Sequence, residues 1–276
     1  MSHPASDRTV LITGGGRGIG FELAKLCAAD GATVVLVDVS EATLNGAVEE
    51  LRKRGARAEG FVHDVTDRDG CYALRRRVED AVGDVDVLVN NAGIVHKGDF
   101  LAGEDSAWAH TVDVNLNGVM WMMHAFMPSM VKRGRGHVVN VASILGLAPA
   151  GGAAVYCATK HAVIALTEAV RFELLERGYP GVHLTAACPG FTDTGMFRGV
   201  RTPPMFRAVA PRDTAKAIYR GMRRRSRVIR YPYRFYFLPQ FYALCPHPLW
   251  RAATRLLGVH RAMDSHTANR LTASDE

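Results

Sequence analysis

Short apolar runs alternate with amphipathic segments along most of the chain. Runs rich in valine, isoleucine and leucine are typical of strands buried on both faces of a parallel sheet. They lie at residues 9–13, 33–38, 58–64, 86–90, 137–143, 182–188 and 227–231. Between them, apolar residues recur at helical spacing, for example at 19–30, 41–54, 68–82 and 112–133. The alternation predicts an α/β fold with a doubly wound parallel sheet of seven strands and helices on both faces.

The spacing of these segments favours one domain followed by an extension. The chain has 276 residues, which suits a single large α/β domain. No internal repeat, low-complexity linker or other boundary interrupts the pattern before about residue 225. We therefore expect one domain over residues 1–230 and a basic, aromatic-rich C-terminal extension over residues 231–276.

Basic residues concentrate near the C-terminus. The formal net charge is +7, and no acidic residue lies between Asp213 and Asp264. A nucleic-acid-binding protein usually carries its basic residues on a recognisable binding motif, and this sequence contains none. We therefore expect no nucleic-acid partner. Binding through the arginine-rich stretch, which would weaken steeply with salt, remains an alternative.

Several features favour a cytosolic chain without bound metal. The polar N-terminus lacks a signal-peptide pattern, and no apolar run is long enough to cross a bilayer. The five cysteines are scattered without metal-ligand spacing, so we expect reduced, mostly buried thiols and no disulfide framework. The histidines form no paired-ligand pattern, so we expect no structural or catalytic metal.

A glycine-rich turn follows the first apolar run. The sequence TGGGRGIG places Gly14, Gly18 and Gly20 at the start of a helical segment. Glycines at these positions allow a tight turn and a close approach to a pyrophosphate, whose charge the N–H groups of the helix N-terminus would meet. Such turns also occur for packing reasons alone, but the position after the first strand favours a dinucleotide site.

Asp38, at the end of the second run, bears on the choice of cofactor. Its carboxylate could accept hydrogen bonds from both ribose hydroxyls of an adenosine. It would also repel a 2′-phosphate, by roughly 4 kcal/mol for unit charges about 4 Å apart at an effective dielectric of about 20. Arg17, inside the glycine turn, favours the opposite choice because a guanidinium can bind that phosphate. We expect Asp38 to dominate, so NAD(H) is favoured and NADP(H) is the alternative.

Tyr156 and Lys160 are four residues apart in the small and apolar stretch AAVYCATKHAV. On a helix this spacing places both side chains on one face. The ammonium would favour the phenolate and lower the pKa of a phenol, which is about 10 in water, towards neutral pH. The pair also occurs by chance in many helices, so the rest of the chain must decide whether it is catalytic.

Six motifs occur in an order that resembles the short-chain dehydrogenase/reductase family. They are TGGGRGIG, NNAG at 90–93, Asn115, Ser143, YCATK at 156–160 and PGFTDT at 189–194, and the resemblance covers roughly residues 7–230. It implies a single-domain Rossmann fold and an oxidoreductase that uses a nicotinamide cofactor, needs no metal and forms a homodimer or homotetramer. It also implies a catalytic tetrad of Asn115, Ser143, Tyr156 and Lys160. In that tetrad Tyr156 is the acid/base, Ser143 contacts the substrate oxygen, and Asn115 holds a water beside Lys160.

The resemblance further implies which residues contact the cofactor. The pyrophosphate would lie on the turn that contains Gly14, Gly16, Arg17, Gly18, Ile19 and Gly20, and the adenine between Asp64 and Val65. The nicotinamide ribose would lie beside Asn91, Ala92, Gly93, Tyr156 and Lys160. Pro189 and Gly190 would form the bend after the sixth strand, with Thr192 and Thr194 placed to hold the carboxamide.

The loops that would form the substrate pocket contain apolar or small residues. We expect Ser143, Leu145, Pro149, Met196 and Phe197 to contact the substrate, with Leu147, Ala150, Met205 and Phe206 as further wall candidates. These residues favour a hydrophobic small molecule, namely an alcohol of steroid, retinoid or long-chain type, or its ketone or aldehyde. The alternative function is a nucleotide-sensing or membrane-docked interaction protein that keeps the fold without turnover.

The C-terminal extension allows two interpretations. Residues 231–257 combine many aromatic side chains with arginines, and four prolines divide the stretch into short pieces. The aromatic side chains could fold back over the substrate cleft or contact a second subunit. They could instead lie at the headgroup level of a membrane or lipid droplet, which the prolines would prevent the segment from spanning.

Overall fold

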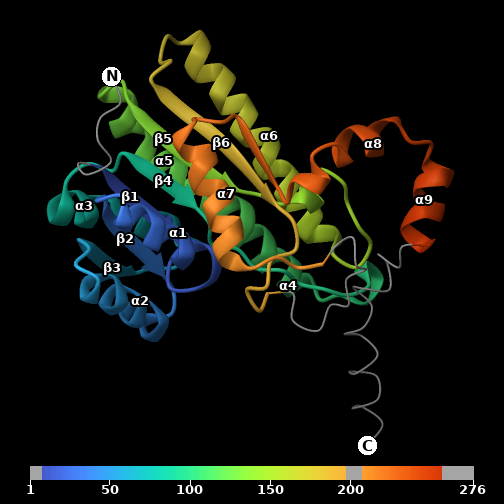
Figure 1. Ribbon diagram of the computed structural model, residues 1–276, viewed down its shortest axis with the longest axis horizontal. Coiled ribbons are helices and arrows are strands. Elements are labelled where there is room, and N and C mark those ends of the chain that lie inside the picture. Colours follow the sequence, from blue (N-terminus) through green and yellow to red (C-terminus); the bar gives the residue numbers. More distant parts are fainter. Residues whose placement is uncertain (1–7, 197–206, 257–276) are drawn as a thin grey trace, which may run out of the picture.

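The computed structural model describes residues 8–196 and 207–256, and over these ranges seven parallel strands form a single sheet (Figure 1). The strands follow the order β3-β2-β1-β4-β5-β6-β7. They are β1 (Thr9–Thr13), β2 (Thr33–Asp38), β3 (Ala58–Val62), β4 (Val87–Asn90), β5 (Gly136–Val141), β6 (Val182–Pro189) and β7 (Val228–Tyr231). Each apolar run in the sequence therefore contains one strand, and the predicted fold class is confirmed.

Helices connect the strands and cover both faces of the sheet. They are α1 (Gly18–Ala29), α2 (Glu41–Lys53), α3 (Arg68–Val82), α4 (Asp105–Val112), α5 (Gly118–Lys132), α6 (Ala154–Glu176), α7 (Pro211–Arg223), α8 (Leu238–Leu244) and α9 (His247–Leu256). The expected helical segment over 112–133 is helical from Val112 to Lys132, and a π-helical turn, Asp113–Asn117, joins α4 to α5 within it.

Alternate side chains of each strand pack into two separate cores. Leu11 and Val35 contact the cluster beneath α3, α5 and α6, whereas Ile12 and Leu36 contact the cluster beneath α1, α2 and α7. All four side chains are fully buried. Because a strand places successive side chains on opposite faces, near-continuous apolar runs are the pattern that a sheet covered on both faces requires.

The strand order creates a crevice at the carboxyl edge of the sheet. β1 pairs with β2 on one side and with β4 on the other, so the connections leave β1 and β4 in opposite directions. In doubly wound sheets, ligands bind at this point of reversal. The glycine turn after β1 and the loop after β4 flank the crevice.

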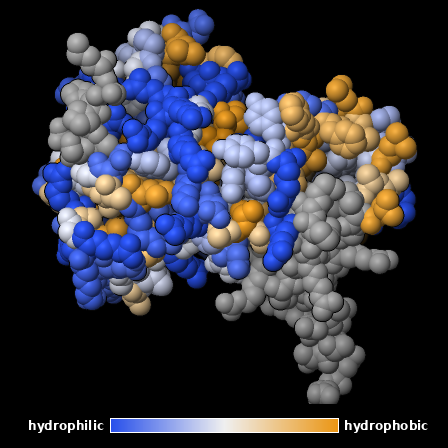
Figure 2. All heavy atoms as spheres, in the orientation of Figure 1, coloured by the Kyte–Doolittle hydropathy of each residue, from blue (hydrophilic) through white to orange (hydrophobic). Residues whose placement is uncertain are grey.

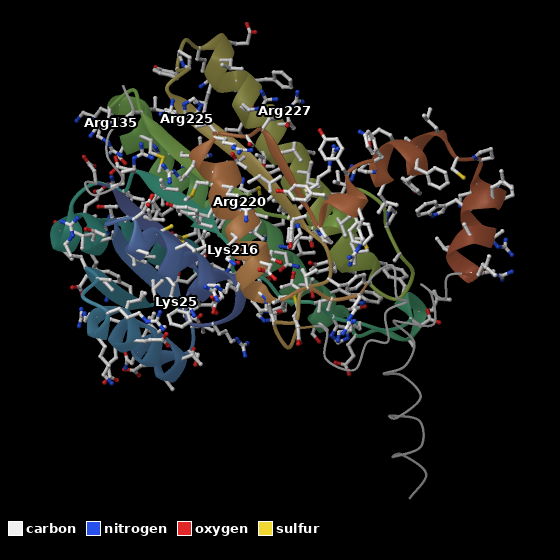
Figure 3. All side chains as sticks on the ribbon, viewed as in Figure 1. Lys25, Arg135, Lys216, Arg220, Arg225 and Arg227 are labelled. Carbon is white, nitrogen blue, oxygen red and sulfur yellow. The ribbon has the colours of Figure 1, made fainter. Side chains whose placement is uncertain are left out.

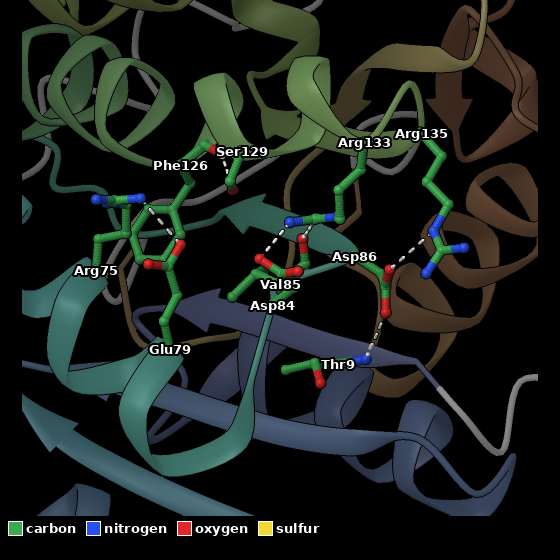
Figure 4. Close-up of polar contacts among 10 residues, drawn as sticks. All are labelled: Thr9, Arg75, Glu79, Asp84, Val85, Asp86, Phe126, Ser129, Arg133 and Arg135. Carbon is green, nitrogen blue, oxygen red and sulfur yellow. Dashed lines mark hydrogen bonds and ion pairs between the residues drawn. The ribbon is translucent and has the colours of Figure 1, made fainter.

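Polar side chains stabilise the opposite, amino-terminal end of the sheet (Figure 4). Arg133 forms an ion pair with Asp84 and donates to the Val85 carbonyl at 2.8 Å. Asp86 accepts from the Thr9 N–H at 3.1 Å and lies 3.9 Å from Arg135. These contacts connect β1, the start of β4 and the segment before β5. The end of the sheet away from the crevice is therefore closed by internal pairing.

Basic side chains of α1, α7 and the segment before β7 share one side of the molecule (Figure 3). Several of them pair with acidic residues, either on the same helix or from elsewhere in the chain. Lys216 lies 3.6 Å from Asp213, and Arg227 lies 2.8 Å from Glu168. The basic stretch seen in the sequence is thus partly neutralised in the fold.

The C-terminal extension begins in contact with the body of the protein and then projects from it (Figure 1). β7 ends at Tyr231, one residue beyond the expected domain boundary, and a single helical turn, Tyr233–Phe235, follows it. Phe235 is buried, whereas α8 and α9 carry several exposed apolar side chains. Within the described ranges, no helix combines the length and hydropathy that crossing a bilayer requires.

Candidate active site

The glycine turn after β1 is built by close backbone contacts. A Cβ atom at Gly20 would lie 2.4 Å from the Gly14 carbonyl oxygen, so only glycine allows α1 to begin this close to the turn. Gly14 and Gly18 have φ angles of +61° and +59°, which other residues rarely adopt. The turn therefore has the tight geometry that the sequence predicts.

A threonine and an asparagine connect this turn to the loop after β4. The Thr13 hydroxyl accepts from the N–H groups of Asn91 and Ala92, both at 3.0 Å. The Asn91 carboxamide donates to the carbonyls of Thr13 and Gly14, again at 3.0 Å. The two loops that flank the crevice are thus held together. Sequence reasoning missed the role of Thr13, although a hydroxyl residue at the strand end directly before the glycines could have indicated it.

Asp38 lies at the end of β2 with its carboxylate fixed in orientation. Its Oδ2 accepts from the Gly16 N–H at 3.0 Å, and its Oδ1 accepts from the Ser40 N–H at 3.1 Å. The carboxylate is partly buried, whereas Arg17 is exposed at the edge of the turn. The structure therefore places both residues that bear on cofactor choice next to the same turn.

The residues expected at the adenine lie on the loop after β3. Val65 is buried, and a Cβ at Gly118 would meet its side chain at 2.8 Å. Asp64 is exposed, and its carboxylate accepts from the Thr66 N–H at 2.9 Å. Both residues lie at the carboxyl edge of the sheet.

Tyr156, Ser143 and Lys160 come together between β5 and the first turns of α6. The Tyr156 and Ser143 side chains share a hydrogen bond, and both residues are at most 5% exposed. The Lys160 ammonium donates to the Val141 carbonyl at 2.9 Å and lies 5.7 Å from the centre of the Tyr156 ring. A Cβ at Gly93 would lie 3.3 Å from the Lys160 Nζ, so glycine leaves room for the ammonium.

Burial controls the proton affinity of this group. It raises the pKa of Tyr156 to about 12, although the hydrogen bond from Ser143 acts in the opposite direction. Burial also lowers the pKa of Lys160 to about 8. In the protein by itself the pKa of Tyr156 is therefore raised, and its lowering by Lys160 together with the positive ring of NAD⁺ stays a prediction. The loss of water around the phenol outweighs the ammonium, which is directed to a backbone carbonyl.

Asn115 acts on the loop after β4. Its carboxamide oxygen accepts from the Ile94 N–H, and its nitrogen donates to the Ile94 carbonyl, both at 2.8 Å. The same nitrogen lies 3.3 Å from the Thr159 hydroxyl. Asn115 is fully buried in the π-helical turn before α5. Its carboxamide is therefore occupied by protein contacts, and the expected role of Asn115 in holding a water stays a prediction.

The segment after β6 crosses the crevice from the other side. The Gly190 N–H donates to the Tyr231 carbonyl at 2.7 Å. Thr192 is buried, and its hydroxyl contacts the Gly190 carbonyl and the Thr214 hydroxyl. The Thr194 methyl group lies 3.1 Å from where a Cβ at Gly18 would be. Thr194 thus lies beside the glycine turn, whereas the Thr192 hydroxyl is directed into the protein, and the expected contact of both with the carboxamide stays a prediction.

The apolar cluster around Tyr156 includes Phe191 of the PGFTDT motif and Phe235 of the C-terminal extension. Both are buried there, together with Leu145. A Cβ at Gly190 would meet the Phe235 ring at 3.0 Å. At Phe235 the extension therefore folds back beside Tyr156, which agrees with the first of the two interpretations of its aromatic side chains.

The expected substrate residues are placed only in part. Leu145 packs beside Tyr156, and both Leu145 and Pro149 line a cavity between α6 and the C-terminal helices. Met196 is half-buried at the edge of the described residues. Phe197, Met205 and Phe206 lie outside the described residues.

The residues of this crevice fit a bound dinucleotide. Arg17 precedes α1 without a side-chain acceptor for the first N–H groups of that helix, which leaves them available to an anion. The turn lacks side chains along this approach, and the Asp38 carboxylate lies beside it. Among the described residues no cluster of three potential metal ligands occurs. The arrangement can bind a dinucleotide and exchange a proton at the Tyr156 hydroxyl.

Comparison with known proteins gives consistent results. The family model described as "short chain dehydrogenase" matches residues 8–204. Epidermal retinol dehydrogenase 2 of Homo sapiens is 33% identical over 258 residues, which cover 92% of this chain and 84% of the relative. Estradiol 17-beta-dehydrogenase 11 of Rattus norvegicus is 34% identical over 227 residues, which cover 81% and 74%. A crystal structure of a short chain dehydrogenase/reductase from Burkholderia phymatum in complex with NAD superimposes with a TM-score of 0.80 at 28% identity, covering 87% of this chain and 94% of that one.

Proposed function

This chain belongs to the short chain dehydrogenase family, and we propose that it interconverts a hydrophobic alcohol and its carbonyl compound with Tyr156 as the acid/base. It is an oxidoreductase that depends on a nicotinamide dinucleotide. The observation that carries the proposal is the hydrogen bond between Tyr156 and Ser143, which lies in a buried apolar cluster beside Lys160.

The proton chemistry follows from these three side chains. For carbonyl reduction, the Tyr156 hydroxyl donates its proton to the substrate oxygen while Ser143 donates a hydrogen bond to the same atom. For alcohol oxidation, Tyr156 must first lose its proton, and the Lys160 ammonium stabilises the phenolate that results. A bound nicotinamide dinucleotide would supply or accept the hydride. With its pKa at about 12, Tyr156 is a phenol at neutral pH and is ready to act as the acid.

The substrate we propose is of retinoid or steroid type. Two similar proteins carry the names retinol dehydrogenase and estradiol dehydrogenase. The side chains around the Tyr156 hydroxyl also favour an apolar molecule, since Leu145, Phe191 and Phe235 surround it. These side chains could bury a hydrophobic ring or chain, which is stabilised by about 25 cal/mol per Å² of apolar area removed from water.

A substrate screen tests this function. All-trans-retinol, estradiol and straight-chain alcohols would be offered with NAD⁺ or NADP⁺, and the reduced cofactor followed by its absorbance. Tyr156→Phe should lose roughly 10²- to 10⁴-fold in kcat, whereas Tyr179→Phe, on an exposed tyrosine, should not. Equal kcat in the wild type and Tyr156→Phe would contradict the assignment. Cofactor binding without turnover of any substrate would instead favour a nucleotide sensor, which the complete tetrad argues against.

We propose NAD(H) as the preferred cofactor. Asp38 supports this choice because two backbone N–H groups hold its carboxylate beside the glycine turn. A 2′-phosphate there would meet a like charge, whereas ribose hydroxyls would donate to it. Arg17 is exposed, so a bond from its guanidinium to a phosphate would be screened by solvent.

Residues 231–276 are proposed as an extension of the catalytic domain, which would comprise residues 1–230. Exposed apolar side chains gather over α8 and α9, as Figure 2 shows. Phe237 is 72% exposed and Leu244 is 84% exposed, and the stretch carries arginines without acidic residues. Aromatic rings and arginines together suit the headgroup level of an anionic membrane or lipid droplet, where each arginine contributes about 1 kcal/mol. We propose peripheral contact through this surface for a protein that otherwise resides in the cytosol.

Flotation with liposomes tests the membrane contact. The intact chain should float with anionic vesicles at low salt, and the double variant Phe237→Ser/Leu244→Ser should not. Truncation after Arg230 would be a poor test because it removes Phe235 from the cluster around Tyr156. Equal recovery of the intact chain and the double variant with the floating vesicles would contradict the proposal.

Light scattering after size exclusion would test the homodimer or homotetramer that we also propose.

A further inference from the structure

A cavity of about 800 Å³ lies between α6 and the C-terminal helices. The loop after β5 forms one side through Leu145 and Pro149, and the first half of α6 forms the floor. Tyr242 of α8 and Trp250 of α9 lie across from it. The α8 and α9 segment therefore stands away from α6 instead of packing directly against it (Figure 1).

The cavity is on the opposite side of α6 from the catalytic groups. Tyr156 and Lys160 are buried on the sheet side of this helix, whereas Ala158 is exposed and lines the cavity. With 3.6 residues per turn, Ala158 points about 200° away from Tyr156 around the helix axis. The helix itself thus separates the cavity from the Tyr156 hydroxyl. Leu145 and Ala150 of the loop after β5 and Cys157 of α6 belong both to the cluster around Tyr156 and to the cavity lining.

The size and lining of the cavity suit an apolar ligand. Protein interiors are close-packed, and gaps much larger than a water molecule are few. Here the α6 side is lined by Ala154, Ala158 and Ala162, whose small side chains leave the space open. Ligand sites typically enclose about 300–1,000 Å³ and are lined mainly by apolar side chains. The exposed Ala154 and Ala158 open this space to solvent, so an apolar chain bound there would remove their apolar surface from water.

One edge of the cavity is positively charged. Arg251 lines it from α9, and His247 lies one turn earlier on the same helix. Arg251 forms no ion pair within the described part of the chain, and residues 214–263 contain no acidic residue. A guanidinium binds carboxylate and phosphate oxygens through paired N–H donors. A ligand with an anionic group could therefore bind at this edge of the cavity.

We propose that the cavity binds an amphiphile whose apolar chain lies along the alanines of α6 and whose carboxylate or phosphate contacts Arg251. This site goes beyond the proposed function, because it lies across α6 from the Tyr156 hydroxyl and binding there needs no turnover, although the loop with Leu145 and Pro149 borders both places. A ligand there would connect α9 with α6, filling the space that now lies between them.

Isothermal titration calorimetry of the full-length protein tests this site. Dodecanoate and dodecyl phosphate, each below its micellar concentration, should bind saturably with one ligand per chain. Dodecan-1-ol, which has the chain without the charge, should bind at least tenfold more weakly. Arg251→Gln should weaken dodecanoate about tenfold and leave dodecan-1-ol unchanged. Arg255→Gln is the matched control, since Arg255 is exposed on the same helix and does not line the cavity.

A second variant tests the location. Ala158→Phe places a ring in the cavity on the side of α6 away from Tyr156, so dodecanoate binding should fall at least tenfold while NADH binding persists. Binding that is unchanged in both Ala158→Phe and Arg251→Gln would overturn the proposal, as would failure of the wild type to bind any of the chains. If Ala158→Phe does not fold, Arg251→Gln decides alone. A wild-type protein that binds dodecanoate but turns over no alcohol would contradict the proposed function only. A wild-type protein that turns over an alcohol but does not bind dodecanoate would contradict this site only.

Discussion

Lys160 holds its ammonium 5.7 Å from the centre of the Tyr156 ring while donating to the Val141 carbonyl at 2.9 Å. The carbonyl fixes the lysine, so its charge stays next to the phenol without a direct ion pair between the two. Burial acts on both groups in the direction of neutrality: the pKa of Tyr156 rises to about 12, and that of Lys160 falls to about 8. At neutral pH the two side chains are therefore a neutral phenol and an ammonium whose pKa lies close to the pH of the solution.

The first prediction concerns the pH dependence of the two directions of reaction. Oxidation needs the phenolate of Tyr156. While the pH is below the pKa of Tyr156, the phenolate fraction rises tenfold for each unit that the pH increases. We expect kcat for alcohol oxidation to rise with pH between about 6 and 8, and kcat for carbonyl reduction to vary little there. Steady-state rates in both directions would measure this. Oxidation that is independent of pH over the range would show that another group takes the proton.

The second prediction concerns the Lys160 charge. Lys160→Met removes the ammonium and keeps a similar apolar stem, so the phenolate loses the positive charge that stabilises it. We expect oxidation to fall by about 10²-fold or more and its rise with pH to move to higher pH. Lys132→Met, on the exposed last turn of α5, serves as the control and should change neither. If the pH dependence of oxidation in Lys160→Met matched that of the wild type, Lys160 would not control the pKa of Tyr156.

The third prediction concerns the close contact in the glycine turn. Gly20→Ala would place a Cβ 2.4 Å from the Gly14 carbonyl oxygen and 2.6 Å from the Asn91 Nδ2, so the turn must shift. NADH affinity, measured by fluorescence, should fall at least tenfold. Gly46→Ala is the matched control, because a Cβ there meets nothing within 4 Å and Gly46 lies inside α2. That variant should bind NADH normally and gain about 0.5–1 kcal/mol in its free energy of unfolding.

The fourth prediction concerns cofactor choice at Asp38. Asp38→Ser removes the negative charge but keeps a group that can hydrogen-bond a ribose. We expect wild-type protein to bind NADH more tightly than NADPH, and Asp38→Ser to narrow or reverse that difference. Asp69→Ser, on an exposed aspartate of α3, would control for the change in net charge. A wild-type preference for NADPH would show that Arg17 outweighs Asp38.

The sequence predicted the sheet and most of the crevice because both depend on local signals. Apolar runs mark strands that are buried on both faces, and glycines mark a turn whose close contacts only glycine allows. The π-helical turn between α4 and α5 could not be predicted in this way. It forms where Asn115 hydrogen-bonds to the Ile94 backbone, and helical periodicity carries no trace of that contact.

Contacts between distant segments account for the other differences. The pKa of Tyr156 was expected to fall because Lys160 lies one turn away, which local spacing does show. It rises because the phenol is buried in a cluster that includes Phe191 and Phe235, which come from the segments after β6 and β7. Thr192 matched a motif, yet its hydroxyl contacts Thr214 of α7. A motif identifies a position, and the direction of its side chain depends on partners elsewhere in the fold.

The last prediction concerns stability and the buried His137 of β5. Its imidazole contacts the Thr185 hydroxyl at 2.8 Å and lies edge-on to His183. Burial lowers the pKa of His137 to about 3, and the nearby charges of His183, Arg225 and Arg8 act in the same direction. The unfolded chain, with an ordinary histidine pKa of about 6.5, then binds a proton that the folded protein excludes. The contribution of neutral His137 to the free energy of unfolding is therefore fully present above about pH 6.5, and it falls by up to about 1.4 kcal/mol per pH unit as the pH drops towards 3.

Urea unfolding at pH 7.5 and 4.5 should show this loss of stability, and His137→Gln should reduce the loss. His124→Gln, on an exposed histidine of α5, is the control. An equal loss in wild type and His137→Gln would assign the acid sensitivity to other groups.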